Sequence, residues 1–184
     1  MSKIKNRIEL AKHFNELGFK TGAEIGTCYG RFSEILCWSI PKLKLIAVDN
    51  WNNRINSDRE RKLEVPGEIF TRIRLKPYNN VTVLKKDSIE AAKEVPNGSL
   101  DFVFIDANHS YNAVKADIEA WSPKVRKGGI VSGHDYYIFS SGRRGIVDAV
   151  DEYAKNNNIK LQVIERDRDS VVSDDRLPCW FFVK

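Results

Sequence analysis

Three residues with side chains that can bind a metal follow two apolar segments of the sequence. Asp106 comes directly after Phe102–Ile105, and His134 and Asp135 come shortly after Ile130–Val131. Magnesium prefers carboxylate oxygens as ligands, whereas an imidazole nitrogen suits manganese, iron or zinc better. If the two segments form adjacent strands, the three side chains meet at one edge of a sheet. We therefore predict a divalent metal site at Asp106, His134 and Asp135, with magnesium as the first candidate and the choice of metal left open.

His109 lies three residues after Asp106, close enough to share the same ligand. The ordinary pKa of imidazole, about 6.5, suits a group that accepts a proton near neutral pH. The alternative is a histidine that only fixes the loop, because Asp-x-x-His also occurs as a local hydrogen-bonding pattern. The residues alone leave both interpretations open.

Acidic residues recur at the ends of the apolar segments that we interpret as strands. They are Glu24, Asp49, Asp87, Asp106 and Asp135. In an open parallel sheet, ligands bind beyond the carboxyl ends of the strands. A row of carboxylates facing one crevice is costly unless cations or hydroxyl-rich ligands occupy it. The row therefore predicts a ligand with a positive charge, several hydroxyl groups, or both.

The turn after the first acidic residue narrows the choice of ligand. A nicotinamide cofactor usually requires Gly-x-Gly-x-x-Gly, but this chain has only Gly26-x-x-x-Gly30. Glu24 would repel a diphosphate and attract an ammonium or sulfonium group. Asp49 follows Gly26 by 23 positions, where a carboxylate accepts hydrogen bonds from ribose hydroxyls. These features favour S-adenosylmethionine as the ligand.

The elements that position these residues alternate along the chain. The strand-like segments are Ala23–Ile25, Leu43–Val48, Val81–Leu84, Phe102–Ile105, Ile130–Val131, Leu161–Glu165 and Cys179–Val183. Helices are predicted at Ile4–Leu17, Glu68–Leu75 and Ile146–Asn156. Alternation indicates an α/β fold with a mostly parallel sheet, while the last two strands, which have no helix between them, indicate an antiparallel hairpin at its edge. Without a linker or repeat, residues 1–184 are predicted to form a single domain.

Composition excludes several classes of protein. The 184 residues carry a formal charge of +5, but the Lys and Arg residues are scattered rather than gathered into one tract. Three cysteines without paired spacing do not suggest a disulfide framework or a zinc knuckle. The sequence has neither the apolar core of a signal peptide nor a run long enough to span a membrane. We therefore expect a cytoplasmic protein without a membrane partner.

Five motifs in order resemble those of class I S-adenosylmethionine-dependent methyltransferases. They are E-I-G-x-x-x-G, V-D-N-W, D-S, F-I-D-x-x-H-S-Y and G-G-I-V-x-G-H-D, and the resemblance runs from about Gly22 to the C-terminus. More narrowly, they are similar to small-molecule O-methyltransferases related to macrolide-sugar and catechol enzymes. The resemblance implies a Rossmann-like seven-stranded, mostly parallel sheet with an antiparallel C-terminal strand and helices on both faces.

The resemblance also implies a set of cofactor-binding residues. Glu24, Gly26 and Gly30 would line the methionine part of S-adenosylmethionine, and Asp49 would hold the ribose. The remaining predicted cofactor-binding residues are Thr27, Asn50, Trp51, Asp87, Ser88 and Asp106, of which Asp87 and Ser88 would border the adenine.

The activity implied is methyl transfer to a hydroxyl group of a small molecule, such as a sugar or a glycosylated natural product. His109 resembles the general base of the sugar O-methyltransferases. His134 departs from the carboxylate or amide that is usual in metal-dependent relatives. A nucleic-acid methyltransferase and a module that binds S-adenosylmethionine without turnover remain alternatives. A nucleic-acid partner is disfavoured because Asp106-Ala107-Asn108-His109 lacks the Asn/Asp-Pro-Pro-aromatic motif, and a homo-oligomer stays open.

Two loops at the predicted ligand edge are candidates for further roles. The polar start of the segment after Trp51 could cover the pocket, with a solvated loop as the alternative. The segment Tyr136–Gly145 carries aromatic residues and arginines that could hold an acceptor with a sugar or an acidic group.

Overall fold

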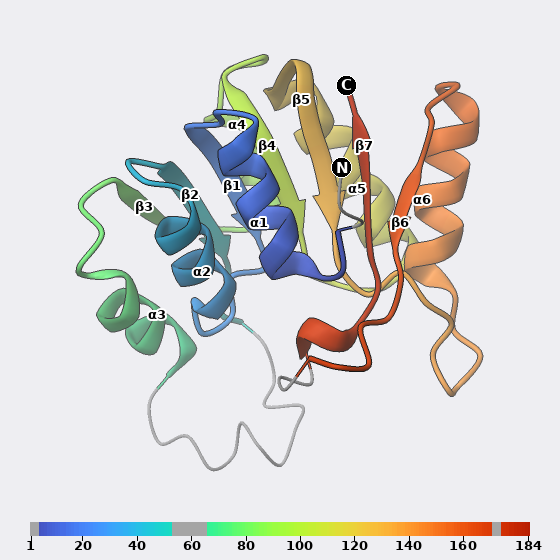
Figure 1. Ribbon diagram of the computed structural model, residues 1–184, viewed down its shortest axis with the longest axis horizontal. Helices are drawn as coiled ribbons and strands as arrows, with labels where there is room; N and C mark the ends of the chain where they lie inside the picture. The colour runs from blue at the N-terminus through green and yellow to red at the C-terminus, as the bar shows by residue number, and fades with distance from the viewer. Residues whose placement is uncertain (1–3, 53–65, 171–173) are drawn as a thin grey trace.

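One seven-stranded sheet organises the protein, as seen in a computed structural model that describes residues 4–52, 66–170 and 174–184 (Figure 1). The strands are β1 Thr21–Ile25, β2 Lys44–Asp49, β3 Val81–Lys85, β4 Leu100–Ile105, β5 Val125–Gly133, β6 Gln162–Ile164 and β7 Cys179–Val183. Their order is β3-β2-β1-β4-β5-β7-β6. The first five strands pair in parallel, whereas β7 runs antiparallel to both β5 and β6. The predicted fold class, including the antiparallel hairpin at the edge, is confirmed.

The register of the sheet brings the predicted site residues to one edge. Ile25, at the end of β1, lies opposite Val48 of β2 and Ile105 of β4. Ile105 lies in turn opposite Gly133 of β5. The residues that follow these positions therefore leave the sheet side by side, at the lower edge in Figure 1 where the arrowheads point.

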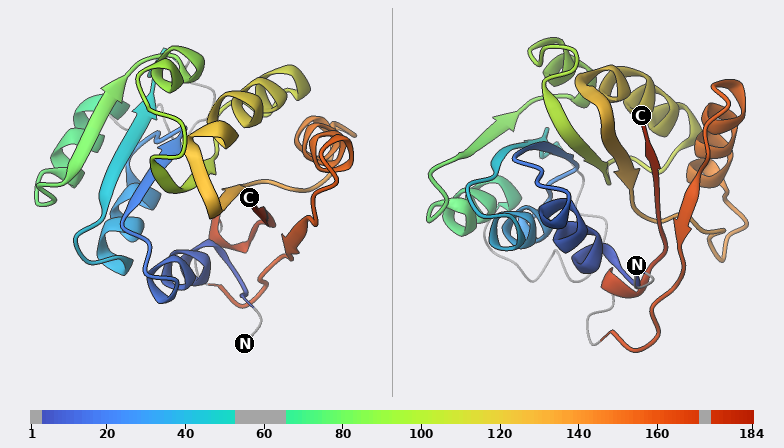
Figure 2. Two further views of the ribbon diagram at one scale, coloured as in Figure 1. Left: turned by 90° about the horizontal axis from the view of Figure 1, so that it is seen from above. Right: turned by 45° about the horizontal axis from the view of Figure 1, so that its top comes forward.

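Helices cover both faces of the sheet (Figure 2). They are α1 Arg7–Glu16, α2 Arg31–Ser39, α3 Gly67–Leu75, α4 Ser88–Lys93, α5 Tyr111–Trp121 and α6 Gly145–Asn156. One apolar cluster joins α1 and α2 to one face of the sheet, with Phe14, Leu36 and Phe104 fully buried. A second cluster joins α4, α5 and α6 to the opposite face. Burial on both faces explains why the central strands are continuous apolar runs rather than alternating ones.

Local signals account for the helix boundaries. The helix predicted from Ile4 begins instead at Arg7, because the Asn6 side chain caps it by accepting hydrogen bonds from the backbone N–H groups of Ile8 and Glu9 at 3.0 and 3.1 Å. The helices predicted at Glu68–Leu75 and Ile146–Asn156 are confirmed as α3 and α6, and each begins one residue earlier than predicted. The fifth strand is longer than predicted, because β5 continues past an irregularity in its pairing with β4.

None of the helices in the described ranges combines the length and the apolar character that crossing a membrane requires.

Candidate active site

The end of β1 packs tightly against the end of β4. Gly26 has φ +91°, and a Cβ atom at this position would lie 2.0 Å from the backbone oxygen of Asp106. Its N–H donates to the carbonyl oxygen of Val48 at 2.9 Å, and the N–H of Asp106 donates to that of Ile25 at 2.7 Å. Only glycine fits this position, because both the left-handed backbone and the close approach exclude a side chain. The turn between β1 and α2 is thereby fixed against β2 and β4.

Asp49 connects the end of β2 to the same turn. One carboxylate oxygen accepts from the backbone N–H of Cys28 at 2.8 Å, and the other accepts from that of Trp51 at 2.8 Å. The Trp51 indole N–H donates to the carbonyl oxygen of Cys28 at 2.7 Å. The structure therefore brings the predicted cofactor residues of the first two strand ends together.

Three further residues that we predicted to bind the cofactor, Thr27, Gly30 and Asn50, form contacts in this turn and in the loop after β2. The buried Thr27 hydroxyl donates to the carbonyl oxygen of Val48 at 3.3 Å, and Gly30 is the N-cap of α2 with φ +73°. The Asn50 side chain accepts a hydrogen bond from the N–H of Asn52 at 3.0 Å. These contacts shape the loops, and a direct role in cofactor binding stays a prediction for all three residues.

Glu24 is buried within β1, with 2% of its surface exposed. Its carboxyl group accepts a hydrogen bond from the hydroxyl of Ser33 on α2. Burial raises the pKa of Glu24 to about 8, and the hydrogen bond from Ser33 offsets only part of this rise. In the unliganded protein at neutral pH, the carboxyl group is therefore mostly protonated.

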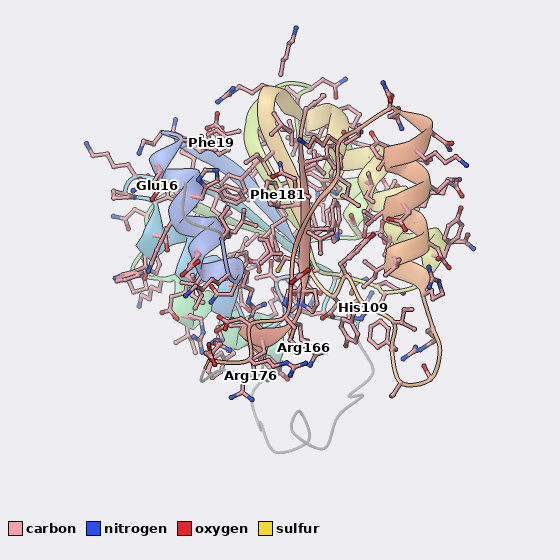
Figure 3. The ribbon with its side chains drawn as sticks, turned by 45° about the vertical axis from the view of Figure 1, so that its right-hand side comes forward. Glu16, Phe19, His109, Arg166, Arg176 and Phe181 are labelled. Carbon is pink, nitrogen blue, oxygen red and sulfur yellow. The ribbon has the colours of Figure 1, made fainter. Side chains whose placement is uncertain are left out.

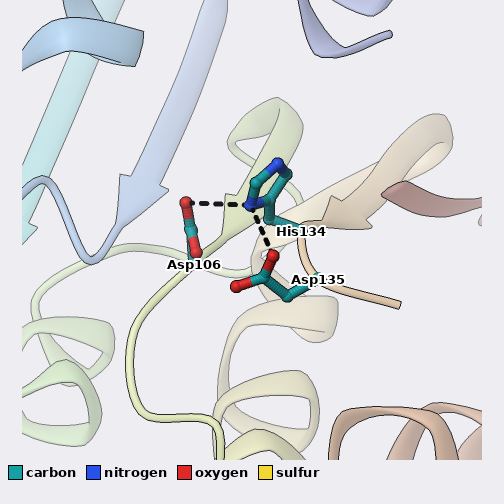
Figure 4. Close-up of side chains that lie close together, drawn as sticks. All are labelled: Asp106, His134 and Asp135. Carbon is teal, nitrogen blue, oxygen red and sulfur yellow. Dashed lines mark ion pairs between the residues drawn. The ribbon is translucent and has the colours of Figure 1, made fainter. Parts of the chain in front are cut away.

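The predicted metal ligands converge beyond β4 and β5 (Figure 4). Nδ1 of His134 lies 3.6 Å from Oδ2 of Asp106 and 3.2 Å from Oδ1 of Asp135. One ligand atom from each residue can be chosen such that all lie within 4.8 Å of one another. Among the described residues, Oδ1 of Asp135 is buried yet forms no hydrogen bond, despite its proximity to His134. Two carboxylates and an imidazole, one oxygen still lacking a hydrogen-bond donor, form a donor set that fits a divalent ion.

His109 lies beside the same two carboxylates. Its Nε2 is 3.4 Å from Oδ2 of Asp135 and 3.7 Å from Oδ1 of Asp106. The interaction with Asp106 raises the pKa of His109, and the charge of Asp135 adds to this effect, although burial opposes it. Burial likewise lowers the pKa of His134, but the two carboxylates outweigh it and raise the pKa above its ordinary value. A small cavity of about 10 Å³, comparable to the volume that one water molecule needs, is lined by Asp106, His109 and His134 among others.

Sequence reasoning missed Arg7, which reaches this cluster from α1. The side chain is buried, and its guanidinium group lies 3.7 Å from Asp106 and 2.7 Å from Asp175. Arg31 also pairs with Asp175, at 2.9 Å. The sequence shows only that Arg7 is a charged residue near apolar positions of the predicted helix, and this does not identify Asp106 or Asp175 as its partners.

The predicted residues at the end of the third strand, Asp87 and Ser88, form hydrogen bonds at the start of α4 and with α5. Asp87 is exposed and caps α4 by accepting from the N–H of Ile89 at 2.9 Å. The Ser88 hydroxyl accepts from the indole N–H of Trp121 at 2.9 Å and also bonds to Asp117. Contact with adenine stays a prediction for both residues, and the predicted cover after Trp51 lies largely in residues 53–65, outside the described ranges.

The part of the chain that forms this edge of the sheet matches a known protein family. Residues 23–136, which include the turn, Asp49 and the Asp106/His134/Asp135 cluster, match a family described as a methyltransferase domain. The uncharacterized protein y4gI of Sinorhizobium fredii (strain NBRC 101917 / NGR234) is 29% identical over 126 residues, or 65% of this chain. The chain spans only 13% of the length of that relative.

Solved structures share the fold at low sequence identity. An O-methyltransferase from Bacillus cereus in complex with SAH has a TM-score of 0.68 at 17% identity, with 97% of this chain and 80% of that one covered. Precorrin-6y C5,15-methyltransferase from Geobacter metallireducens gives 0.68 at 16% identity, with 96% and 87% covered. The N-methyltransferase NodS from Bradyrhizobium japonicum gives 0.64 at 14% identity, with 97% and 94% covered. Proteins named for methylation of different atoms thus share this fold.

The expected resemblance to class I methyltransferases is confirmed by the family match and by the strand order. The chain belongs to the methyltransferase domain family.

Proposed function

We propose that this protein is an S-adenosylmethionine-dependent methyltransferase whose acceptor is a hydroxyl group of a small molecule. The observation that carries the proposal is the meeting of two groups of residues at one sheet edge. The Gly26 turn and Asp49 lie on one side, and the cluster of Asp106, His109, His134 and Asp135 lies beside it. The first group suits a cationic nucleoside, and the second suits removal of a hydroxyl proton.

The cofactor would bind across the ends of β1 and β2. Its sulfonium group supplies an electrophilic methyl group when it is bound. The Gly26 turn would let the backbone approach the methionine part, while Asp49 would accept hydrogen bonds from the ribose hydroxyls. Asp49 already binds two backbone N–H groups, which orients its carboxylate and leaves lone pairs for the ribose.

His109 would act as the general base. Because Nε2 faces the carboxylates of Asp106 and Asp135, these oxygens favour the tautomer that carries hydrogen on Nε2. The lone pair of Nδ1 is then available to accept the proton of the acceptor hydroxyl. Asp106 and Asp135 would also stabilise the imidazolium ion that results.

Asp106, His134 and Asp135 would hold a divalent ion, with magnesium as the first candidate. Such an ion, when bound, would position the acceptor oxygen and stabilise its developing negative charge. The three side chains fit this role because they present hard oxygen ligands and one nitrogen from two adjacent strand ends. The imidazole of His134 makes manganese, iron and zinc competitors for the site.

Calorimetric titration with S-adenosylmethionine and S-adenosylhomocysteine tests the proposal. We expect both to bind the unaltered protein, and Asp49→Ala to weaken binding by roughly tenfold or more, because ribose hydrogen bonds to a charged group are lost. Asp49→Asn keeps the size of the side chain and one of its two acceptor oxygens, so it should weaken binding as well, because the charge and one of the two loop contacts are lost. Asp148→Asn, an exposed change on α6, should leave binding unchanged. If neither compound binds, or if Asp49→Ala binds as tightly as the unaltered protein, the proposal fails.

A further inference from the structure

Two aromatic side chains extend from His109 toward the molecular surface. The ring centroid of Phe139 lies 5.8 Å from that of His109, with 30° between the ring planes. The ring of Tyr137 lies 4.5 Å from Phe139, at 36°. Both rings are only partly buried. An apolar, partly open platform therefore begins at the proposed base and leads away from it.

Two arginines lie on this platform, each above a different ring. The guanidinium carbon of Arg143 lies 5.1 Å from the ring centroid of Phe139, and that of Arg166 lies 5.7 Å from the ring centroid of Tyr137. Both residues are exposed. Figure 3 shows Arg166 and His109 at the same end of the molecule. Segments far apart in sequence thus place two positive charges over the aromatic rings that lead away from the proposed base.

Neither guanidinium group forms an ion pair with a carboxylate in residues 4–52, 66–170 and 174–184. Within these ranges, the Nε of Arg143 donates to the hydroxyl of Ser141, at 3.1 Å. The adjacent Arg144, by contrast, pairs with Asp148 at 2.9 Å. The N–H groups of a guanidinium lie in its own plane, so an arginine that lies over a ring can still bind a carboxylate or phosphate in bidentate fashion. Arg143 and Arg166 therefore offer anion-binding capacity that the described parts of the chain leave unused.

Backbone contacts hold the segment in place. The N–H of Phe139 donates to the carbonyl oxygen of Arg143 at 3.0 Å, and that of Gly142 donates to Phe139 at 2.8 Å. A Cβ atom on Gly145 would lie 2.5 Å from the backbone oxygen of His109, so only glycine permits this approach. The loop that carries Arg143 is thereby anchored directly against the loop that carries His109.

Opposite charges adjoin the two ends of this row of rings. Asp106 and Asp135 lie beside Nε2 of His109, whereas Arg143 and Arg166 lie over the rings of Phe139 and Tyr137. Burial raises the pKa of Tyr137 and Asp135 adds to the rise, while Arg166 and Arg143 both oppose it. Both arginines therefore act on the same side chain. A molecule with an anionic end would be oriented with that end outward and its other end toward His109.

We propose that the acceptor carries an anionic carboxylate or phosphate group, which Arg143 and Arg166 bind, while its body lies on Tyr137 and Phe139 and its hydroxyl faces His109. This inference rests on the proposed function and adds the chemical class of the acceptor. Arg143 and Arg166 are specificity residues here, because they contact the far end of the acceptor rather than the reacting atoms.

The experiment measures binding rather than turnover, by ligand-observed NMR on the protein saturated with S-adenosylhomocysteine. One series uses glucose, glucuronate and glucose 6-phosphate, which differ at a single carbon by a neutral, a carboxylate or a phosphate group. A second compares 3,4-dihydroxybenzoate with 3,4-dihydroxybenzamide. The variant is Arg143→Gln/Arg166→Gln. The control is Arg126→Gln, which removes an exposed arginine from the start of β5, at the opposite end of the strand from the site.

We expect the anionic member of at least one series to bind roughly tenfold or more tightly than its neutral counterpart. The preference should vanish in the double variant, persist in Arg126→Gln and weaken as salt is added. The relative affinities of glucuronate and glucose 6-phosphate identify the anion. Equal binding of charged and neutral members, no binding by any member, or a preference that survives the double variant overturns the inference.

The same samples separate this inference from the proposed function. The double variant should bind S-adenosylhomocysteine as tightly as the unaltered protein, because neither arginine belongs to the Gly26 turn or to Asp49. If S-adenosylhomocysteine fails to bind the unaltered protein, the proposed function fails. If it binds but no anion preference appears, only the inference about the acceptor fails.

Discussion

The guanidinium group of Arg7 lies 3.7 Å from Oδ2 of Asp106, so the first helix contacts a carboxylate that the end of β4 presents to the site. The same guanidinium lies 2.7 Å from Asp175, whose side chain is fully buried. One arginine thereby joins α1, the sheet edge and the segment before β7. Its positive charge also offsets part of the negative charge that gathers at that edge.

Replacing Arg7 by Met should lower the free energy of unfolding by about 3 kcal/mol, since removing one partner leaves a buried carboxylate without its full compensation. Urea unfolding monitored by circular dichroism measures the change. Arg72→Gln is the matched control, because Arg72 and its partner Glu68 lie on α3 in contact with solvent, which screens the charges and makes such a pair weak. Equal effects of the two substitutions would show that Arg31 alone compensates Asp175.

The buried Glu24 makes stability depend on pH. Its pKa is about 8 in the folded protein, against an ordinary value of 4.5. The folded state thus binds the proton more tightly than the unfolded state, so the stabilisation is complete below about pH 4.5 and is lost as the pH rises toward 8. Glu24→Gln, which imitates the protonated carboxyl group, should be the more stable form at pH 8, by on the order of a few kcal/mol.

Unfolding at pH 5, 6.5 and 8 tests this expectation. The gap between Glu24→Gln and the unaltered protein should widen as the pH rises. Glu90→Gln, at an exposed position on α4, serves as the control and should follow the unaltered protein at every pH. A constant gap across the three pH values contradicts the assignment to Glu24.

Gly26→Ala should damage both stability and cofactor binding. The added Cβ would lie 2.0 Å from the backbone of Asp106, which forces the ends of β1 and β4 apart. We expect a loss of at least about 3 kcal/mol in thermal or urea unfolding, together with loss of S-adenosylhomocysteine binding by calorimetry. Gly98→Ala isolates the backbone effect, because Gly98 has φ +70° but no atom within 4 Å of the added Cβ. That variant should lose only about 1–2 kcal/mol.

His109→Ala should lower turnover by roughly 10²–10⁴-fold, the usual effect of removing a general base, with the affinity for S-adenosylmethionine almost unchanged. The assay measures methyl transfer to an acceptor found in a screen of hydroxyl-bearing compounds. His13→Ala, on α1 beside Glu16, is the control and should retain full activity. Full activity of His109→Ala would return His109 to a structural role in its loop.

Removal of divalent metal should abolish methyl transfer if Asp106, His134 and Asp135 bind a required ion. After chelation and dialysis, we expect activity to return on adding magnesium or manganese, and Asp135→Asn to need a higher metal concentration. His134→Asp should shift the preference toward magnesium, because an oxygen replaces the nitrogen ligand. Undiminished turnover after rigorous chelation would show that the histidines and Arg7 suffice to balance the two carboxylates.

The positions that the sequence predicts correctly are those that strand topology determines. Asp106 and Asp135 follow parallel strands that pair in register, so the pattern of apolar segments was enough to place them together. Ser33 and Arg7 were missed because their partners, Glu24 and Asp175, come from other elements, and no local pattern encodes such contacts. Ser88 has a partner that its motif did not indicate, because its hydroxyl accepts a hydrogen bond from the Trp121 indole, and its contact with adenine stays a prediction.

The position of β7 between β5 and β6 has a consequence for how the molecule forms during synthesis. The sheet is complete only when β7, which follows β6 in the sequence, has inserted between β5 and β6. The bond from Asn6 to Asp167 spans 161 positions, and that from Arg7 to Asp175 spans 168. Such distant pairings form late, because a long loop must close before they contribute. The surroundings of Asp106 are therefore complete only after residues 175–183 have been synthesised and have packed against the first helix and β5.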